Sequence, residues 1–170
     1  MPSRGSSIIS VAAAVAVICF FLPWFLVSCQ GEPIAEVSGW QLAAGQRYQD
    51  GYSTPFTQAS AYRIQAVELF LVLLAALGCL VAVFLAYQHR ITVRRAVSIA
   101  LGLAVLSLLV VFYEIADVHS DLADYGLTVK LRIGILGTIL ANAAAILGAV
   151  FDLRDRGDAQ IGRDGGPREL

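Results

Sequence analysis

Four long apolar runs dominate the sequence and restrict the chain to folds that suit a lipid bilayer. A helix needs about 17–25 mostly apolar residues to cross the hydrocarbon core of a membrane. None of the four runs contains Asp, Glu, Lys or Arg, so none shows the polar stripe of a helix on a soluble protein. The runs cover residues 8–27, 69–87, 96–113 and 133–151.

The composition agrees with a membrane protein of one domain. Of the 170 residues, 58% are hydrophobic and 15% are charged, whereas soluble domains average about 45–50% and about 25%. The net charge of −1 gives no reason to expect nucleic-acid binding. We expect a membrane domain over residues 1–156 and a polar, disordered cytoplasmic tail over residues 157–170.

We therefore predict an all-α membrane protein, a four-transmembrane-helix bundle with a small extracytoplasmic loop that contains a β-hairpin. The expected spans are about 8–28, 65–87, 96–115 and 132–151, and the expected outer loop is 29–64. Eight basic residues lie with the two ends and the link at 88–95, and four lie on the other side. Because basic residues stay on the cytoplasmic side, both termini are predicted to be cytoplasmic.

The stretch Leu26-Val27-Ser28-Cys29 has two interpretations. It is similar to a lipoprotein cleavage box, and cleavage there would leave Cys29 as a lipidated N-terminus. The preceding apolar run, however, is longer than the roughly 7–15 residues of a signal sequence. Pro23-Trp24 also suits the outer end of a helix, because proline disfavours helical geometry before it and tryptophan anchors at the interface. This second interpretation, an uncleaved helix, is the one we favour.

A hairpin is expected directly after this helix. The turn residues Gln30 to Pro33 separate two β-prone pieces, Phe25 to Cys29 and Ile34 to Val37. Ser38-Gly39 then turns the chain into one helical turn ended by Gly45.

Short motifs in this region resemble those of uncharacterised bacterial four-helix integral membrane proteins. They are Leu22-Pro23-Trp24, Cys29, Ser38-Gly39, Leu42-Ala43 with Gly45, and Tyr125-Gly126 before the last apolar run. The layout also resembles claudin-like tetraspans, although those proteins carry two cysteines in the first outer loop and this chain has only Cys29 there. The resemblance implies architecture and a multi-pass place in a bacterial inner membrane, without an activity.

Small residues recur on one face of the last predicted helix: Gly134, Gly137, Ala141, Ala145 and Gly148. Such a face lets a neighbouring helix approach closely, so we predict that it is a helix-packing face. The pair Ser98 and Gly102 predicts a second packing face on the third helix. Asn142, near the middle of the last helix, is expected to make an interhelical hydrogen bond.

Two acidic residues, Glu68 and Glu114, lie at the outer ends of predicted helices. Ionisable groups at membrane depth are candidates for function, but so near a helix end they reach water more easily. We predict ion pairs of these acids with Arg63, Lys130 or Arg132 at the outer interface.

These features favour a non-catalytic interaction or scaffold protein, or an accessory subunit of a membrane complex. Its expected partners are the lipid bilayer and other membrane proteins or further copies of itself. We expect no catalytic site, cofactor or metal, because the titratable residues form no recognisable set. The alternative is a small oligomeric transporter or channel that uses Glu68 and Glu114.

Overall fold

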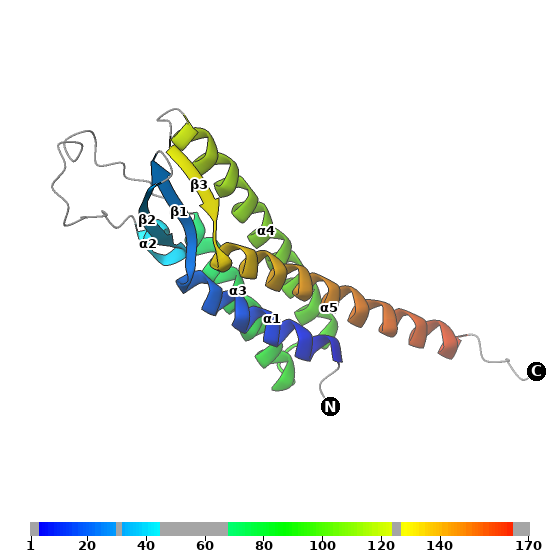
Figure 1. The fold of residues 1–170 in the computed structure, drawn as a ribbon. Coiled ribbons are helices and arrows are strands. Elements are labelled where there is room, and N and C mark those ends of the chain that lie inside the picture. The colour runs from blue at the N-terminus through cyan, green and yellow to red at the C-terminus, as the bar shows by residue number, and fades with distance from the viewer. Residues whose placement is uncertain (1–3, 30–31, 45–67, 124–126, 165–170) are drawn as a thin grey trace, which may run out of the picture.

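The computed structural model describes residues 4–29, 32–44, 68–123 and 127–164, and within them the side chains of 5–28, 36–44, 68–118 and 128–154. Four long helices form a bundle (Figure 1): α1 (Arg4–Phe21), α3 (Leu69–Tyr87), α4 (Val93–Ala123) and α5 (Ile133–Asp164). A short helix, α2 (Gly39–Ala44), and three strands complete the described fold. The strands are β1 (Pro23–Cys29), β2 (Glu32–Ser38) and β3 (Leu127–Leu131).

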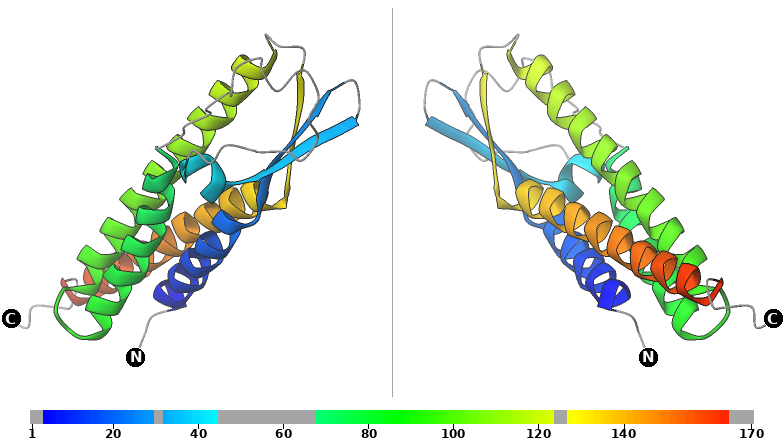
Figure 2. Two further views of the ribbon diagram at one scale, coloured as in Figure 1. Left: turned by 90° about the vertical axis from the view of Figure 1, so that its left-hand side faces the viewer. Right: turned by 90° about the vertical axis from the view of Figure 1, so that its right-hand side faces the viewer.

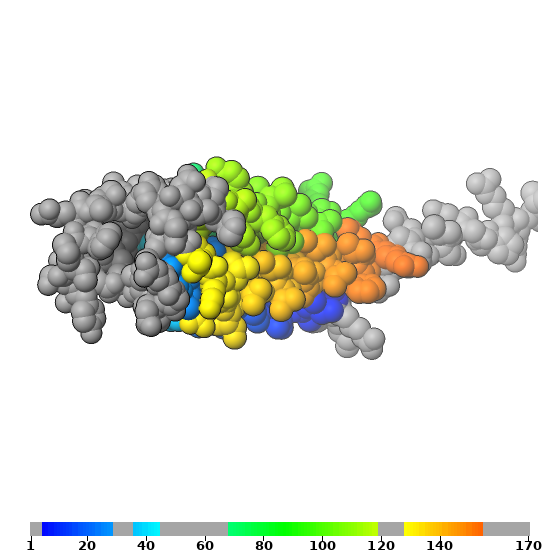
Figure 3. Space-filling view, turned by 45° about the horizontal axis from the view of Figure 1, so that its top comes forward, coloured from blue at the N-terminus to red at the C-terminus, as the bar shows by residue number. Residues whose placement is uncertain are grey.

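The long helices pack as two pairs that lie against each other. Helix α1 lies mainly against α5, and α3 lies mainly against α4. Contacts of α4 with α5 and of α1 with α3 join the pairs, and Figure 3 shows α5 between α4 and α1 on one face. The strands gather at one end of the bundle, whereas the start of α1 and the α3–α4 connection lie at the other end (Figures 1 and 2).

Three of the described helices are long and apolar enough to cross a membrane, which agrees with the predicted membrane character. These stretches are Leu69–Tyr87, Val93–Val118 and Ile133–Arg154. Helix α1 is also apolar but shorter. Large apolar side chains point outward from all four helices, among them Val11, Leu74, Leu109 and Leu140. Exposed apolar surface of this kind is what contact with lipid tails requires.

The ends of the helices differ from the predicted spans. Helix α1 ends at Phe21, not near residue 28, because Pro23 disfavours helix before it and the chain then enters β1. Helix α4 is longer than 96–115. Helix α5 continues through Asp164, where a disordered tail was expected from residue 157. Extending an existing helix adds one hydrogen bond per residue, and the next proline after α5 is Pro167.

The strands form one antiparallel sheet in the order β2-β1-β3. The predicted hairpin is confirmed, since Leu26 pairs with Glu36 and Val27 pairs with Ala35. The third strand was not predicted. It comes from the segment before α5 and pairs with the other edge of β1, with Val27 opposite Val129. Strand β1 is therefore the central strand, and the sheet joins two parts of the chain that lie far apart in sequence.

Candidate functional site

The three-stranded sheet and α2 form a cap on one end of the bundle, and Trp24 fixes this cap to α1. Trp24 is fully buried, and its indole Nε1 donates a hydrogen bond of 2.9 Å to the carbonyl oxygen of Cys19. The last carbonyls of a helix have no partner within the helix. The Trp24 indole thus adds a second donor to this carbonyl, which also accepts from the backbone N–H of Leu22 at 3.2 Å, and it ties the start of β1 to the end of α1.

Arg132, between β3 and α5, connects to both β1 and β2 of the cap. Its backbone N–H donates to the carbonyl oxygen of Trp24 at 2.8 Å. Its guanidinium Nη2 lies 2.6 Å from Oε1 of Glu36 on β2. One residue therefore contacts the central strand through its backbone and the far strand through its side chain. Both side chains are close to half exposed, so the ion pair itself adds little stability, roughly 0–1 kcal/mol.

The two faces of the sheet differ in polarity. One face, with Phe25, Val27, Val37 and Val129, packs into the largest apolar core of the molecule. Directly opposed residues on antiparallel strands point to the same side, so Leu26 shares the outer face with its partners.

These partners are Glu36 on β2 and Lys130 on β3, and both side chains are exposed. Thr128, also exposed, donates from its hydroxyl to the carbonyl of Ser28 at 3.3 Å. We call the residues Leu26, Glu36, Thr128, Lys130 and Arg132 the outer cap face.

Helix α2 closes the cap on its β2 side. Ser38 and Gln41 form a capping box at its start: Gln41 N–H donates to Ser38 Oγ at 3.2 Å, and Ser38 N–H donates to Gln41 Oε1 at 2.9 Å. Gly39 lies so close to α1 that an added Cβ would be 2.8 Å from the carbonyl oxygen of Phe20. A residue with a side chain at position 39 would therefore clash with this backbone oxygen.

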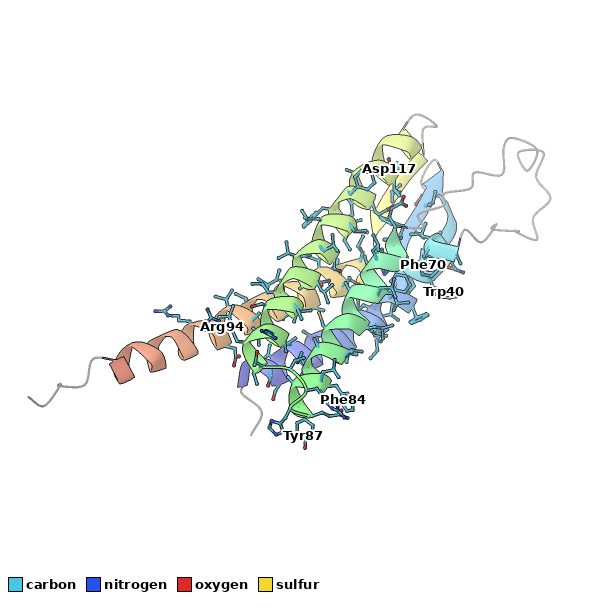
Figure 4. All side chains as sticks on the ribbon, turned by 180° about the vertical axis from the view of Figure 1, so that it is seen from behind. Trp40, Phe70, Phe84, Tyr87, Arg94 and Asp117 are labelled. Atoms are coloured by element: carbon cyan, nitrogen blue, oxygen red, sulfur yellow. The ribbon has the colours of Figure 1, made fainter. Side chains whose placement is uncertain are left out.

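Trp40 on α2 joins an aromatic cluster between the ends of α1 and α3. Its ring stacks on Phe21 with 5.9 Å between centroids and meets Phe70 edge to face at 5.7 Å. Figure 4 shows Trp40 and Phe70 together at the start of α3. Trp40 is also partly exposed, and tryptophan at such a position is typical of a membrane interface.

The predicted packing face of α5 lies against α1 and the turn that follows α1. A Cβ added to Gly134 would lie 2.6 Å from Trp24 Cδ1, and one added to Gly137 would lie 2.5 Å from Cys19 Sγ. Gly148 contacts Gly5 and Ile8 at the opposite end of α1.

The two alanines of this face are buried in alanine clusters. Ala141 clusters with Ala16 and Ala76, and Ala145 clusters with Ala12 and Ala104. The pair on α4 behaves differently: Ser98 is exposed, and a Cβ on Gly102 would meet nothing within 4 Å. This pair does not pack within the described structure, so that second packing prediction is wrong for contacts inside one chain.

The predicted outer ion pairs are arranged differently in the structure. Arg132 pairs with Glu36 instead of Glu68 or Glu114, because β3 places it beside the sheet. Lys130 is exposed on the same strand, and Arg63 lies outside the described residues. Glu114 is only 3% exposed, and it is close enough to Glu68 and Asp117 for electrostatic interaction.

Polar side chains inside the bundle bond mostly within their own helix. Asn142 Nδ2 donates to the carbonyl of Thr138 at 2.9 Å, one turn earlier in α5, so the expected interhelical bond is not the one formed. Thr138 Oγ1 donates in turn to Gly134 O at 2.9 Å. Cys19 and Cys79 are buried free thiols. In the ranges that the structure describes, no group of three His, Cys, Asp or Glu residues could hold a metal ion.

Sequence reasoning missed two parts of the cap, namely β3 and the role of Glu36. The signal for β3 was present, because Leu127 to Leu131 alternates apolar and polar residues with two β-branched members. Nothing in the spacing of Glu36 and Arg132, which lie 96 residues apart, indicates that they meet. Cys29 ends β1, paired with Glu32 and Leu127, and its side chain lies outside the described part.

Comparison of this chain with protein-family models, with curated proteins and with solved structures finds no match.

Proposed function

We propose that this chain is a non-catalytic, four-span integral membrane interaction protein, or an accessory subunit of a membrane complex, whose outer cap face binds a partner. The observation that carries the proposal is the cap itself. Three strands from two parts of the chain pair into one sheet, and Arg132 adds a backbone bond to Trp24 and an ion pair to Glu36. One face of the sheet is used by the core, and the other presents polar side chains. Preorganised polar surface of this kind suits recognition.

In this proposal α1 is the fourth span. Its 18 residues extend about 27 Å at 1.5 Å per residue, close to the roughly 30 Å of a hydrocarbon core. Val11 and Ile18 expose more than half of their surface on the side away from α5, as lipid contact requires. The excess of arginine beside the termini and the 88–95 link supports a cytoplasmic location for that end. The proposed location is a bacterial inner membrane, with the cap outside.

Site-specific photocrosslinking tests the proposed partner surface. A benzophenone amino acid at Thr128, on the outer cap face, should give a discrete protein adduct in intact cells. The matched position is Leu109, which is 63% exposed on α4 and points to lipid. A second protein or a second copy of this chain is a supporting adduct only if Lys130→Glu removes it and Arg94→Glu does not. An adduct that is indifferent to both changes, or that forms equally from Leu109, would contradict the proposal.

The burial of Glu114 favours a second candidate, a small transporter or channel. An acidic side chain 97% covered within a membrane-spanning helix is a functional hypothesis by itself, and Glu68 and Asp117 interact with it electrostatically. Proton flux into proteoliposomes, followed with an enclosed pH-sensitive dye, tests this role. A transport function predicts flux that Glu114→Gln abolishes and Glu36→Gln preserves. The absence of flux above empty liposomes would exclude proton transport and leave the interaction role.

A further inference from the structure

A groove runs between α1 and α3 at the end of the bundle opposite the cap. Its volume is about 570 Å³, within the roughly 300–1,000 Å³ of sites that hold small ligands. The first turns of α1 form one wall with three serines, and the last two turns of α3 form the other wall with apolar residues. The residues on which the argument depends are Ser6, Ser7, Ser10, Leu80, Phe84 and Tyr87.

The two walls have different chemistry. Ser10 Oγ donates to the carbonyl of Ser6 at 3.0 Å, so this hydroxyl oxygen keeps lone pairs that can accept a hydrogen bond. The opposite wall offers hydrocarbon and the ring of Phe84, and Tyr87 stands at the rim, largely exposed. A ligand that matches both walls is an amphiphile with an apolar chain and a polar end.

The connection beyond Tyr87 is held in a defined conformation at this rim. Arg90 N–H donates to Leu85 O at 3.0 Å, and His89 N–H donates to Ala86 O at 3.1 Å. This is the hydrogen-bond pattern of a Schellman motif. His89 takes its left-handed position with φ of 56°, where glycine is the usual residue because a side chain is strained there. The motif fixes His89 and Arg90 next to Tyr87.

The positive charge of this rim favours a ligand whose polar end is anionic. The connection and the start of α4 carry exposed Arg90, Arg94 and Arg95 and no acidic residue between positions 88 and 95. Basic residues at a membrane surface attract anionic headgroups. Figure 4 shows Arg94 apart from Phe84 and Tyr87. Arg90, three residues after Tyr87 in the Schellman motif, is the arginine nearest in sequence to the groove-lining residues.

We propose that this groove binds one anionic phospholipid from the leaflet on the side of the N-terminus. An acyl chain would lie along α3 between Leu80 and Phe84, the phosphate would lie beside Arg90, and a hydroxyl of the headgroup would donate a hydrogen bond to Ser10 Oγ. The inference goes beyond the interaction role and depends only on insertion of the bundle in a membrane.

Native mass spectrometry of the purified full chain tests this proposal. The protein is incubated in mild detergent with equal amounts of phosphatidylglycerol and phosphatidylcholine that carry identical acyl chains. We expect one retained lipid per chain, with phosphatidylglycerol preferred. Ser10→Phe fills the groove and should remove the retained lipid. Val11→Phe, one residue further on and facing away from α3, is the matched control and should keep it.

A charge pair tests the headgroup separately from the groove. Arg90→Gln should abolish the preference for phosphatidylglycerol while total retention remains, whereas Arg94→Gln should preserve the preference. Because both arginines are exposed, neither change threatens folding. Equal retention by the parent, Ser10→Phe and Val11→Phe would overturn the proposal, as would equal binding of the two lipids by the parent. A dimer that dissociates on Ser10→Phe would instead assign the groove to a second copy of the chain.

Discussion

At the scale of single residues, the distance to a neighbouring backbone segment decides whether a glycine in a helix of this bundle can be replaced by a larger residue. Gly134 was predicted from spacing alone, but its neighbours were not predictable, because they belong to the turn that leads from α1 into β1. A Cβ there would lie 2.7 Å from Pro23 O and 2.8 Å from Leu22 O. Both are backbone atoms, which cannot rotate away as a flexible side chain can. Gly102, equally small and equally helical, has open space around it.

The matched pair Gly134→Ala and Gly102→Ala tests this difference. Overpacking should lower the stability of Gly134→Ala by about 1–3 kcal/mol. Gly102→Ala should be neutral or slightly stabilising, because alanine has the better helix propensity by about 1 kcal/mol. The measurement is the thermal midpoint of both purified variants in one detergent. Equal midpoints would show that the turn between α1 and β1 does not approach α5 as closely as the structure places it.

A second pair of substitutions, Trp24→Phe and Trp40→Phe, compares how much each tryptophan contributes to stability. Trp24→Phe removes the indole donor from the buried carbonyl of Cys19, which keeps the 3.2 Å hydrogen bond from the Leu22 N–H, and the loss of one hydrogen bond should cost about 0.5–1.5 kcal/mol. Trp40→Phe keeps an aromatic ring at an exposed position and should cost less. Thermal midpoints in the same detergent compare them. A larger loss for Trp40→Phe would mean that the aromatic cluster with Phe21 and Phe70, and not the buried indole, anchors the cap.

At the scale of elements, local signals were readable and long-range ones were not. The apolar runs predict the end of α3 and the start of α5 closely, and the turn at residues 30–33 predicts the β1–β2 hairpin. The predicted start of the second span, near residue 65, lies outside the described residues. Strand β3 was missed because its pairing with β1 spans about a hundred residues and leaves only a five-residue alternating pattern. The end of α1 was placed too late because an apolar strand directly follows an apolar helix, and hydrophobicity alone does not distinguish them.

The position of β1 also bears on the cleavage box at Cys29. Cleavage before Cys29 would remove α1, whose partner is α5, and nearly all of β1, the central strand of the sheet. We therefore predict that the chain is not cut there. Intact mass spectrometry of the protein from its native membrane should show the full chain, with loss of at most the initiator methionine. A species that begins at Cys29 and carries acyl mass would contradict this prediction and the four-span arrangement together.

At the scale of the whole molecule, the bundle has two unlike ends. The three described strands gather at one end, and the start of α1 and the α3–α4 connection lie at the other (Figure 2). The aromatic cluster belongs to the end with the strands, and the lipid-binding groove we propose belongs to the opposite end. Composition and periodicity indicate this division, since turn and strand signals fall only between alternate apolar runs. The candidate site was predictable as a region but not as a surface, because its polar face exists only once β3 has docked on β1.

The two ends should also differ in their accessibility from outside the cell. Thr92 in the α3–α4 connection and Thr128 on β3 are both exposed threonines, one at each end. In a background without the three native cysteines, Thr128→Cys should react with a membrane-impermeant maleimide in intact cells. Thr92→Cys should react only after the membrane is permeabilised.

The physical reason is the distribution of arginine. Moving the 88–95 link with its three arginines across a membrane is strongly disfavoured, whereas the cap side carries fewer basic residues. Labelling at both positions in intact cells would mean that no span or an even number of spans separates them, or that the orientation is mixed. Labelling at Thr92→Cys alone would invert the topology, place the cap in the cytoplasm and direct the search for its partner to cytoplasmic proteins.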